Sequence, residues 1–327
     1  MTSPAALEPP NPTGVLLMAY GTPATPADVE AYYTHVRRGR PPTPELLADL
    51  QRRYDAIGGT SPLLELTRAQ ANGLAAALGD GWVVELGMKH APPFIEDGVA
   101  ALAGRGAHRV VGLGLAPHYS SMSVGEYASR AKAAAGGLGD EGDGGPVVLT
   151  MVESWHLAPG YLDLLARRVT AALDRVAATV PDPDRVEVLF TAHSLPTRIL
   201  EAGDPYRDQL AETAAAVAER LALPRWSVAW QSAGRTADPW IGPDVLEALA
   251  DRAAAGAGGV VVCPAGFVSD HLEILYDLDV EAAAVAERLG IAFARTESPN
   301  ADPSFCATLA EVVTSHLAAA ESAAGHA

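Results

Sequence analysis

The chain has 327 residues, of which 49% are hydrophobic and 19% are charged, so it is long enough for a packed core and favours two domains over one. Its formal net charge of −17 argues against nucleic acid as a partner, because phosphate backbones bind to basic surfaces. Residues 1–13 lack the basic cluster and apolar run of a signal peptide, and no stretch reaches the roughly 18 apolar residues of a membrane span, so we expect a soluble cytoplasmic protein with a disordered tail at 1–13.

Short apolar, β-rich runs alternate with helical patterns along the first half of the chain. Such alternation predicts an α/β fold, in which helices cover both faces of a parallel sheet. The expected strands are 14–19, 83–88 and 109–116, and the expected helices are 26–38, 44–56, 64–78, 92–103 and 123–135.

A glycine-rich stretch at 136–145 interrupts this alternation and predicts a loop near a domain boundary. The alternation then restarts, so we expect one domain at 14–145 and a second at 146–302, with a final helix at 303–320 that packs on the first. The later strands are expected at 146–152, 186–192, 227–231, 260–264 and 291–296, and the later helices include 159–178 and 205–221.

The two halves contain similar strand ends. Residues 15–23 and 188–196 each place Ala at the end of an apolar strand, followed by Tyr20 or His193, a small residue and then Pro. Ligands of open parallel sheets bind beyond the carboxyl ends of the strands. We therefore expect Tyr20 and His193 to face each other across a cleft between the domains.

The segment 267–281 follows an apolar strand and begins a helix. Its carboxylates Glu273, Asp277 and Glu281 are spaced four residues apart, which places them on one helical face. The row is either a solvated acidic face or a site that binds a cation or carries protons. His193 is likewise either structural or functional, since imidazole with carboxylate suits Fe(II) or Zn(II) and a neutral imidazole accepts protons.

Two further features come from composition. Cys263 and Cys306 are too few for a disulfide framework or for the four thiolates of an iron–sulfur cluster, so we expect both to be buried small hydrophobes. Five arginines fall within 17 residues, and composition leaves open whether they are solvated or grip an anion. These are Arg37, Arg38, Arg40, Arg52 and Arg53.

Phosphate-loop, dinucleotide, nucleophile-elbow and Cys-x-x-Cys motifs are absent from the sequence. Other short motifs, each weak alone, stand in an order that leaves little room for coincidence, and through them the chain resembles the ferrochelatase family from about residue 15 to residue 316. The motifs are MAYGTP (18–23), YTHVRRGRP (33–41), YDAIGGTSP (54–62), GMKH (87–90), APHYS (116–120), AHSLP (192–196), WQS (230–232), PWIGP (239–243) and GFVSDHLE (266–273).

This resemblance implies two Rossmann-like domains with a porphyrin cleft between them. It implies that His193 and Glu273 are the catalytic and metal-binding pair, and that Asp277 and Glu281 form an acidic row behind it. A tyrosine at the position of Tyr20 resembles the coproporphyrin III type of monoderm bacteria, in which it approaches the product iron from the face opposite the histidine. The residues implied to contact the porphyrin and its four propionates are Tyr20, Arg37, Arg53, Tyr54, Ser61 and Tyr127.

The expected reaction is therefore insertion of Fe(II) into coproporphyrin III, giving coproheme in haem biosynthesis. Iron is the substrate, and neither a tightly bound cofactor nor an iron–sulfur cluster is expected. The chain lacks the hydrophobic lip of membrane-docking relatives, so we expect no membrane insertion, and its short C-terminus favours a monomer. Two alternatives stay open: cobalt insertion into a reduced tetrapyrrole, and a non-catalytic porphyrin or haem carrier.

Overall fold

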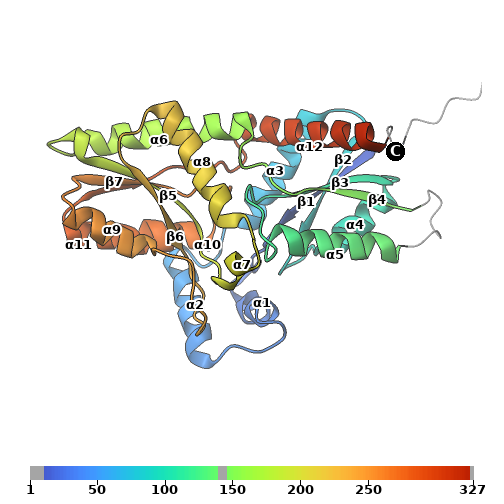
Figure 1. The fold of residues 1–327 in the computed structure, drawn as a ribbon. Coiled ribbons are helices and arrows are strands. Elements are labelled where there is room, and N and C mark those ends of the chain that lie inside the picture. The colour runs from blue at the N-terminus through green and yellow to red at the C-terminus, as the bar shows by residue number, and fades with distance from the viewer. Residues whose placement is uncertain (1–10, 139–145, 325–327) are drawn as a thin grey trace, which may run out of the picture.

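The structure, a computed structural model, describes residues 11–138 and 146–324. They form two four-stranded parallel sheets, ordered β2-β1-β3-β4 and β6-β5-β7-β8, which lie side by side with helices on both faces (Figure 1). The predicted α/β fold with two Rossmann-like halves is confirmed. The strands are β1 (Thr13–Ala19), β2 (Trp82–Met88), β3 (Arg109–Gly114), β4 (Val148–Val152), β5 (Val186–His193), β6 (Trp226–Gln231), β7 (Gly259–Cys263) and β8 (Ala292–Arg295).

The helices follow the predicted order, with shifts at their ends. α2 begins where predicted, because the hydroxyl of Thr43 accepts a hydrogen bond from the backbone N–H of Leu46 at its first turn. α1 ends two residues earlier than predicted, since Arg38 and Gly39 adopt positive φ, which a right-handed helix cannot continue. The helices are η1 (Pro26–Asp28), α1 (Val29–Val36), α2 (Pro44–Ala56), α3 (Leu63–Leu78), α4 (Ile95–Gly104), α5 (Val124–Gly137), α6 (Pro159–Ala177), η2 (Pro183–Arg185), α7 (Arg198–Glu201), α8 (Tyr206–Leu221), α9 (Val245–Ala254), α10 (Leu272–Leu275), η3 (Asp277–Ala282), α11 (Ala283–Leu289) and α12 (Pro303–Ala324).

One hydrophobic core runs through both halves. Val15 and Leu17 of β1 belong to the same buried cluster as Val188 and Phe190 of β5. Every residue of β1 is buried, as expected for a strand covered on both faces. Because the halves share this core, the carboxyl ends of β1 and β5 are held at a fixed separation.

The strand β4 corrects the predicted domain boundary. It pairs with β3 in the first sheet, whereas the sequence assigned 146–152 to the second domain. The reason is that β3, α5 and β4 form one β-α-β unit, so the glycine-rich stretch lies inside this unit rather than between domains; residues 139–145 of that stretch are outside the described ranges. We propose that the first domain ends after Val152.

The last helix packs against both halves, and both cysteines are buried. α12 packs against α3 of the first half and α6 of the second, and it lies alongside the first sheet in Figure 1. Cys263 and Cys306 are both free and buried, so the expectation of small buried hydrophobes is confirmed. Within 11–138 and 146–324, every helix is too short or too polar to cross a membrane. The predicted tail falls outside the described residues at 1–10, whereas Thr13 already belongs to β1.

Helices α1 and α2 project from the body of the molecule on one side of the two sheets (Figure 1). Charged side chains connect α2 to the second half. Arg235 Nη1 lies 2.7 Å from Asp49 Oδ2, and Arg53 Nη1 lies 3.5 Å from Asp277 Oδ1. These two ion pairs therefore connect α2 to the second half.

Candidate active site

His193 and Glu273 meet at the carboxyl end of the second sheet. His193 is the last residue of β5 and Glu273 belongs to α10, and their Nε2 and Oε1 atoms lie 3.4 Å apart. The hydroxyl of Tyr206 donates to the carbonyl of His193 at 3.1 Å, and the amide of Gln231 donates to the carbonyl of Glu273 at 3.1 Å. Both backbones are thus fixed by hydrogen bonds, and the two side chains that the sequence predicted to meet do meet.

The tautomer of His193 follows from its other ring nitrogen. Nδ1 contacts the carbonyl oxygen of Ser194, and because a carbonyl can only accept, Nδ1 must carry the hydrogen. Nε2 therefore presents its lone pair towards Glu273 whenever the ring is neutral. That lone pair can accept a proton or bind a metal ion.

A second imidazole, which sequence reasoning missed, flanks the same carboxylate. His271 Nε2 lies 3.4 Å from Glu273 Oε2, while its Nδ1 donates to the carbonyl of Ser269 at 3.0 Å. The His-x-Glu spacing at 271–273 is the sequence signal for this contact. The two side chains meet only because His271 adopts the extended backbone seen just before α10. Among the described residues, no group of three or more His, Cys, Asp or Glu side chains is arranged to hold a metal ion, so His193 and Glu273 form a two-donor candidate site.

The pair favours its ionised form. Burial alone would lower the pKa of His193, but the Glu273 carboxylate outweighs burial and raises that pKa. Burial alone would raise the pKa of Glu273, yet the His193 and His271 imidazoles hold it well below its usual value. His193 is therefore a stronger base than an ordinary histidine.

Asp277 lies behind this pair on η3, a π-helix, a geometry that is frequent at functional sites. The sequence predicted one continuous α-helix here. Asp277 is 6% exposed, accepts a hydrogen bond from the Ser232 hydroxyl and faces Arg53. Burial, together with the charge of Glu273, raises the pKa of Asp277 to about 7. The negative charge of Glu281 adds to this increase, so the predicted acidic row interacts electrostatically.

Tyr20 extends from the first half towards the same region. It follows β1 directly, its ring centroid lies 4.6 Å from that of His90, and Lys89 Nζ lies 5.7 Å from its centroid. Although 43% of Tyr20 is exposed, burial and then the charge of Glu273 raise the pKa of its phenol. The charge of Glu273 in the second half thus acts on Tyr20 in the first.

Two other predicted residues surround Tyr20. Tyr54 is 3% exposed and its hydroxyl lies 3.4 Å from that of Thr22, and burial raises its pKa to about 12. Tyr127 on α5 is 4% exposed, and burial raises its pKa also. Both interact electrostatically with Tyr20, so three predicted tyrosines lie near one another.

The remaining predicted residues have other partners in this structure. Arg53 pairs with Asp277 and lies with its Cζ 4.9 Å from the Tyr276 ring centroid. Arg37 donates to the carbonyl of Arg40 at 3.2 Å. Ser61 accepts from the backbone N–H of Leu63 at 3.3 Å. Their contacts with a porphyrin stay a prediction.

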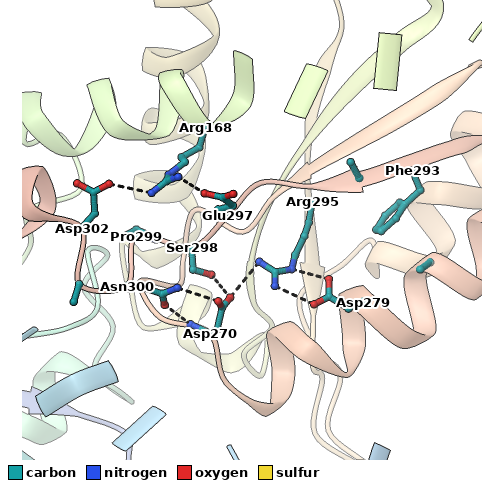
Figure 2. Close-up of a pocket in the computed structure, with 13 residues that line it drawn as sticks. Arg168, Asp270, Asp279, Phe293, Arg295, Glu297, Ser298, Pro299, Asn300 and Asp302 are labelled. Carbon is teal, nitrogen blue, oxygen red and sulfur yellow. Dashed lines mark hydrogen bonds and ion pairs between the residues drawn. The ribbon is translucent and has the colours of Figure 1, made fainter. Parts of the chain in front are cut away.

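A cavity of about 700 Å³ lies elsewhere, at the end of β8 (Figure 2). Neither His193 nor Glu273 lines it. Its lining includes residues of β8, the segment that follows β8, and Asp270, which lies three residues before Glu273.

Comparisons with known proteins agree with the site. The sequence model of the family described as Ferrochelatase matches residues 12–317. The "Coproporphyrin III ferrochelatase" of Geobacillus sp. (strain WCH70) is 44% identical over 310 residues, covering 93% of this chain and 97% of the relative. The "Ferrochelatase" of Herpetosiphon aurantiacus is 46% identical over 306 residues, covering 92% and 98%.

A solved structure supports the architecture alone. The sirohydrochlorin chelatase SirB from Bacillus subtilis subspecies spizizenii, in complex with cobalt, superposes with a TM-score of 0.54 at 12% identity, covering 93% of this chain and 94% of that chain. At this identity the likeness shows the two-sheet fold and not the substrate. The family match and the two sequence relatives, each spanning nine-tenths of the chain or more, show that this protein belongs to the ferrochelatase family of chelatase enzymes, which are lyases.

Proposed function

We propose that this enzyme inserts Fe(II) into coproporphyrin III to give coproheme in haem biosynthesis. The observation that carries the proposal is the His193–Glu273 pair at 3.4 Å, whose charge reaches Tyr20 in the other half. The name of the Geobacillus relative supports coproporphyrin III as the substrate.

The chemistry requires that two pyrrole protons leave as four nitrogens bind Fe(II). When neutral, His193 accepts the two pyrrole protons one after the other at Nε2 and passes the first on before it takes the second, and the adjacent Glu273 carboxylate favours each transfer. Glu273 stabilises the resulting imidazolium and helps to hold the arriving metal. Asp277, with a pKa of about 7, can take up the proton and release it near neutral pH, through Glu281 at the next turn.

Substrate binding uses the arginines. The propionates of coproporphyrin III can form charge-assisted hydrogen bonds with Arg37 and Arg53, while Tyr54, Ser61 and Tyr127 contact the macrocycle and Tyr20 approaches the iron of the product. Arg53 lowers the pKa of Asp277. A propionate that binds Arg53 would therefore weaken this ion pair and raise the pKa of Asp277 further.

The proposal includes the surroundings of the reaction. The enzyme works in the cytoplasm as a monomer, with coproporphyrin III and Fe(II) as its ligands. It needs neither a tightly bound cofactor nor an iron–sulfur cluster, and it binds neither nucleic acid nor membrane. The net charge of −17 supports the part that concerns nucleic acid.

Anaerobic assays with Fe(II) and either coproporphyrin III or protoporphyrin IX test the proposal. We expect the visible spectrum of a metalloporphyrin to develop with turnover, and coproporphyrin III to react at least about tenfold faster, because an apolar pocket gives no such discrimination and arginine contacts do. Stoichiometric binding without turnover would indicate a carrier instead. Turnover that favours protoporphyrin IX would contradict the assignment of the substrate.

A further inference from the structure

A network of side chains lies beside the segment that carries Glu273. It occupies one wall of the cavity in Figure 2. Each charged group drawn there has an oppositely charged partner: Arg168 pairs with Glu297 and Asp302, and Arg295 pairs with Asp270 and Asp279. Because each charge already has an opposite partner, the wall is suited to holding the chain in place. We use the name brace for Gln70, Asp270, Asp279, Arg295, Ser298 and Asn300.

Asp270 and Asn300 form two reciprocal hydrogen bonds. The backbone N–H of Asp270 donates to Asn300 Oδ1 at 2.8 Å, and Asn300 Nδ2 donates to Asp270 Oδ2 at 2.9 Å. Asp270 Oδ1 accepts from the Ser298 hydroxyl at 2.8 Å and pairs with Arg295 Nη1 at 3.1 Å. Asp270 precedes His271 directly, so these bonds fix the backbone from which Glu273 extends.

The backbone of Asn300 is fixed as well. Its φ is +47°, a left-handed conformation that asparagine tolerates better than most residues. Its N–H donates to the carbonyl of Val268 at 2.9 Å. Gln70 Nε2 donates to the carbonyls of Asn300 and Val268, at 2.9 and 3.1 Å. Gln70 is 0% exposed and lies on α3, so the brace is anchored in the half that carries Tyr20.

Arg295 fixes the far end of the same segment. Its Nε and Nη2 donate to the two carboxylate oxygens of Asp279 at 2.7 and 2.9 Å. Asp279 belongs to η3, whereas Asp270 precedes α10. One guanidinium, with 15% of its side chain exposed, therefore connects both ends of the segment that contains Glu273 and Asp277.

We propose that Asn300 and Gln70 are positioning residues for Glu273. They hold 268–271 so that the Glu273 carboxylate meets His193 at a separation that admits a metal ion. This inference rests on the proposed function, because it takes His193 and Glu273 as the metal site. Neither positioning residue contacts the metal or the porphyrin. Changes to groups that orient metal ligands typically cost about 10- to 100-fold in metal affinity or activity.

The test exchanges the amide of Asn300 and the carboxylate of Asp270, first at one position and then at both. Asn300→Asp keeps the acceptor for the Asp270 N–H but replaces the Nδ2 donor with a carboxylate beside Asp270. We expect Zn(II) affinity to fall, and the KM for Fe(II) to rise, by about tenfold, with the KM for coproporphyrin III within about twofold of wild type. Adding Asp270→Asn supplies an amide donor and keeps a carbonyl for Ser298 and Arg295, so we expect both values to return to within about threefold of wild type.

A matched control changes the same cavity without touching the brace. Asp302 pairs with Arg168 and accepts from Ser304. Asp302→Asn removes one carboxylate from this wall, and we expect Zn(II) affinity and both KM values to stay within about twofold of wild type. Asn300→Gly accommodates the positive φ and removes both side-chain bonds without adding a charge. If Asn300→Asp does not fold, this variant must show the weakened Zn(II) binding instead.

Calorimetric titration with Zn(II) alone, without porphyrin, separates this inference from the proposed function. The Zn(II) binding that His193→Ala removes defines the site. Wild-type Zn(II) affinity in Asn300→Asp or in Asn300→Gly, or a double variant no better than the single one, would overturn the inference. So would Zn(II) binding that is unchanged in His193→Ala. Zinc affinities that follow the expected pattern in an enzyme that inserts no iron would support positioning while rejecting the proposed function.

Discussion

The two strand ends that face the candidate site are built differently. Tyr20 after β1 is 43% exposed and packs against the imidazole of His90, whereas His193 at the end of β5 has hydrogen bonds to Nδ1 and to its carbonyl, and a carboxylate at Nε2. The pKa of Tyr20 is raised by burial and by Glu273, so its phenol stays neutral. The same Glu273 raises the pKa of His193 and favours its cation. One carboxylate thus suppresses ionisation on one side of the site and promotes it on the other.

The largest expected effect on the rate comes from replacing the imidazole of His193. We expect His193→Ala to reduce the rate of iron insertion by at least about 100-fold, because general-base groups contribute about 10²- to 10⁴-fold. Anaerobic initial rates with coproporphyrin III measure the effect. His108→Ala, a histidine just before the amino end of β3, serves as the control and should keep the wild-type rate. A His193→Ala enzyme with intact folding and near-normal rates would show that the two strand ends do not differ in this way.

A buried histidine at the junction of the halves should make the free energy of unfolding depend on pH. His118 follows β3, is 1% exposed and pairs through Nε2 with the Thr213 hydroxyl of α8 at 2.9 Å. Burial, and then the charge of His156, lowers the pKa of His118 from 6.5 to about 3. Between these pH values the unfolded chain binds a proton that the folded chain does not, so the free energy of unfolding decreases as pH falls below 6.5.

This linkage amounts to about 2 kcal/mol of lost stability between pH 7 and pH 5. In His118→Gln, which keeps an amide donor for Thr213, that part of the pH dependence should disappear. Urea denaturation of both proteins at pH 5 and pH 7 measures the difference. An equal loss of stability in the variant would mean that His118 is already protonated in the folded state.

Removing the hydroxyl of Tyr20 tests the other strand end and should have a smaller effect on the rate. Because Tyr20 is neutral and its proposed partner is the iron of the product, we expect Tyr20→Phe to change iron insertion by less than about fivefold. The visible spectrum of bound coproheme should change, since an oxygen ligand is lost. An unchanged spectrum would rule out ligation by tyrosine.

The smallest expected effect concerns Asp277. Burial and the charge of Glu273 raise the pKa of Asp277 to about 7, and the hydrogen bond from the Ser232 hydroxyl, which stabilises the carboxylate, opposes that increase. We expect Ser232→Ala to raise that pKa and to move the acidic limb of the pH–rate profile to higher pH by less than about one unit. Thr236→Ala, in the same loop, should leave the profile in place. A shift towards lower pH would contradict the role of this hydrogen bond.

Local patterns carried most of the fold. The apolar runs at β1 and β5 were predicted within a residue or two, because strands covered on both faces consist mostly of apolar residues. The partner of β4 could not be predicted, since alternation of strands and helices fixes their order and not their pairing. The glycine-rich stretch then suggested a boundary where the chain only makes a connection within one sheet.

The sequence predicted the site residues that lie near strand ends. It did not predict contacts between side chains that are far apart in the chain. His193 meets Glu273 as the sequence suggested. The pairing of Arg53 with Asp277 joins residues 224 positions apart, which a search for an arginine cluster cannot detect. His271 was missed because its proximity to Glu273 depends on an extended residue rather than on helical spacing.

The shared orientation of His193 and His271 has a consequence for the order of events. Both rings donate through Nδ1 to a carbonyl and turn Nε2 towards Glu273, so each Nε2 can hold a proton or a metal ion but never both. In the proposed reaction, iron that leaves for the macrocycle vacates the atom that must then receive a pyrrole hydrogen. Iron would leave, and the pyrrole proton would arrive, at the same nitrogen atom. Protons at low pH would therefore compete with iron for that atom.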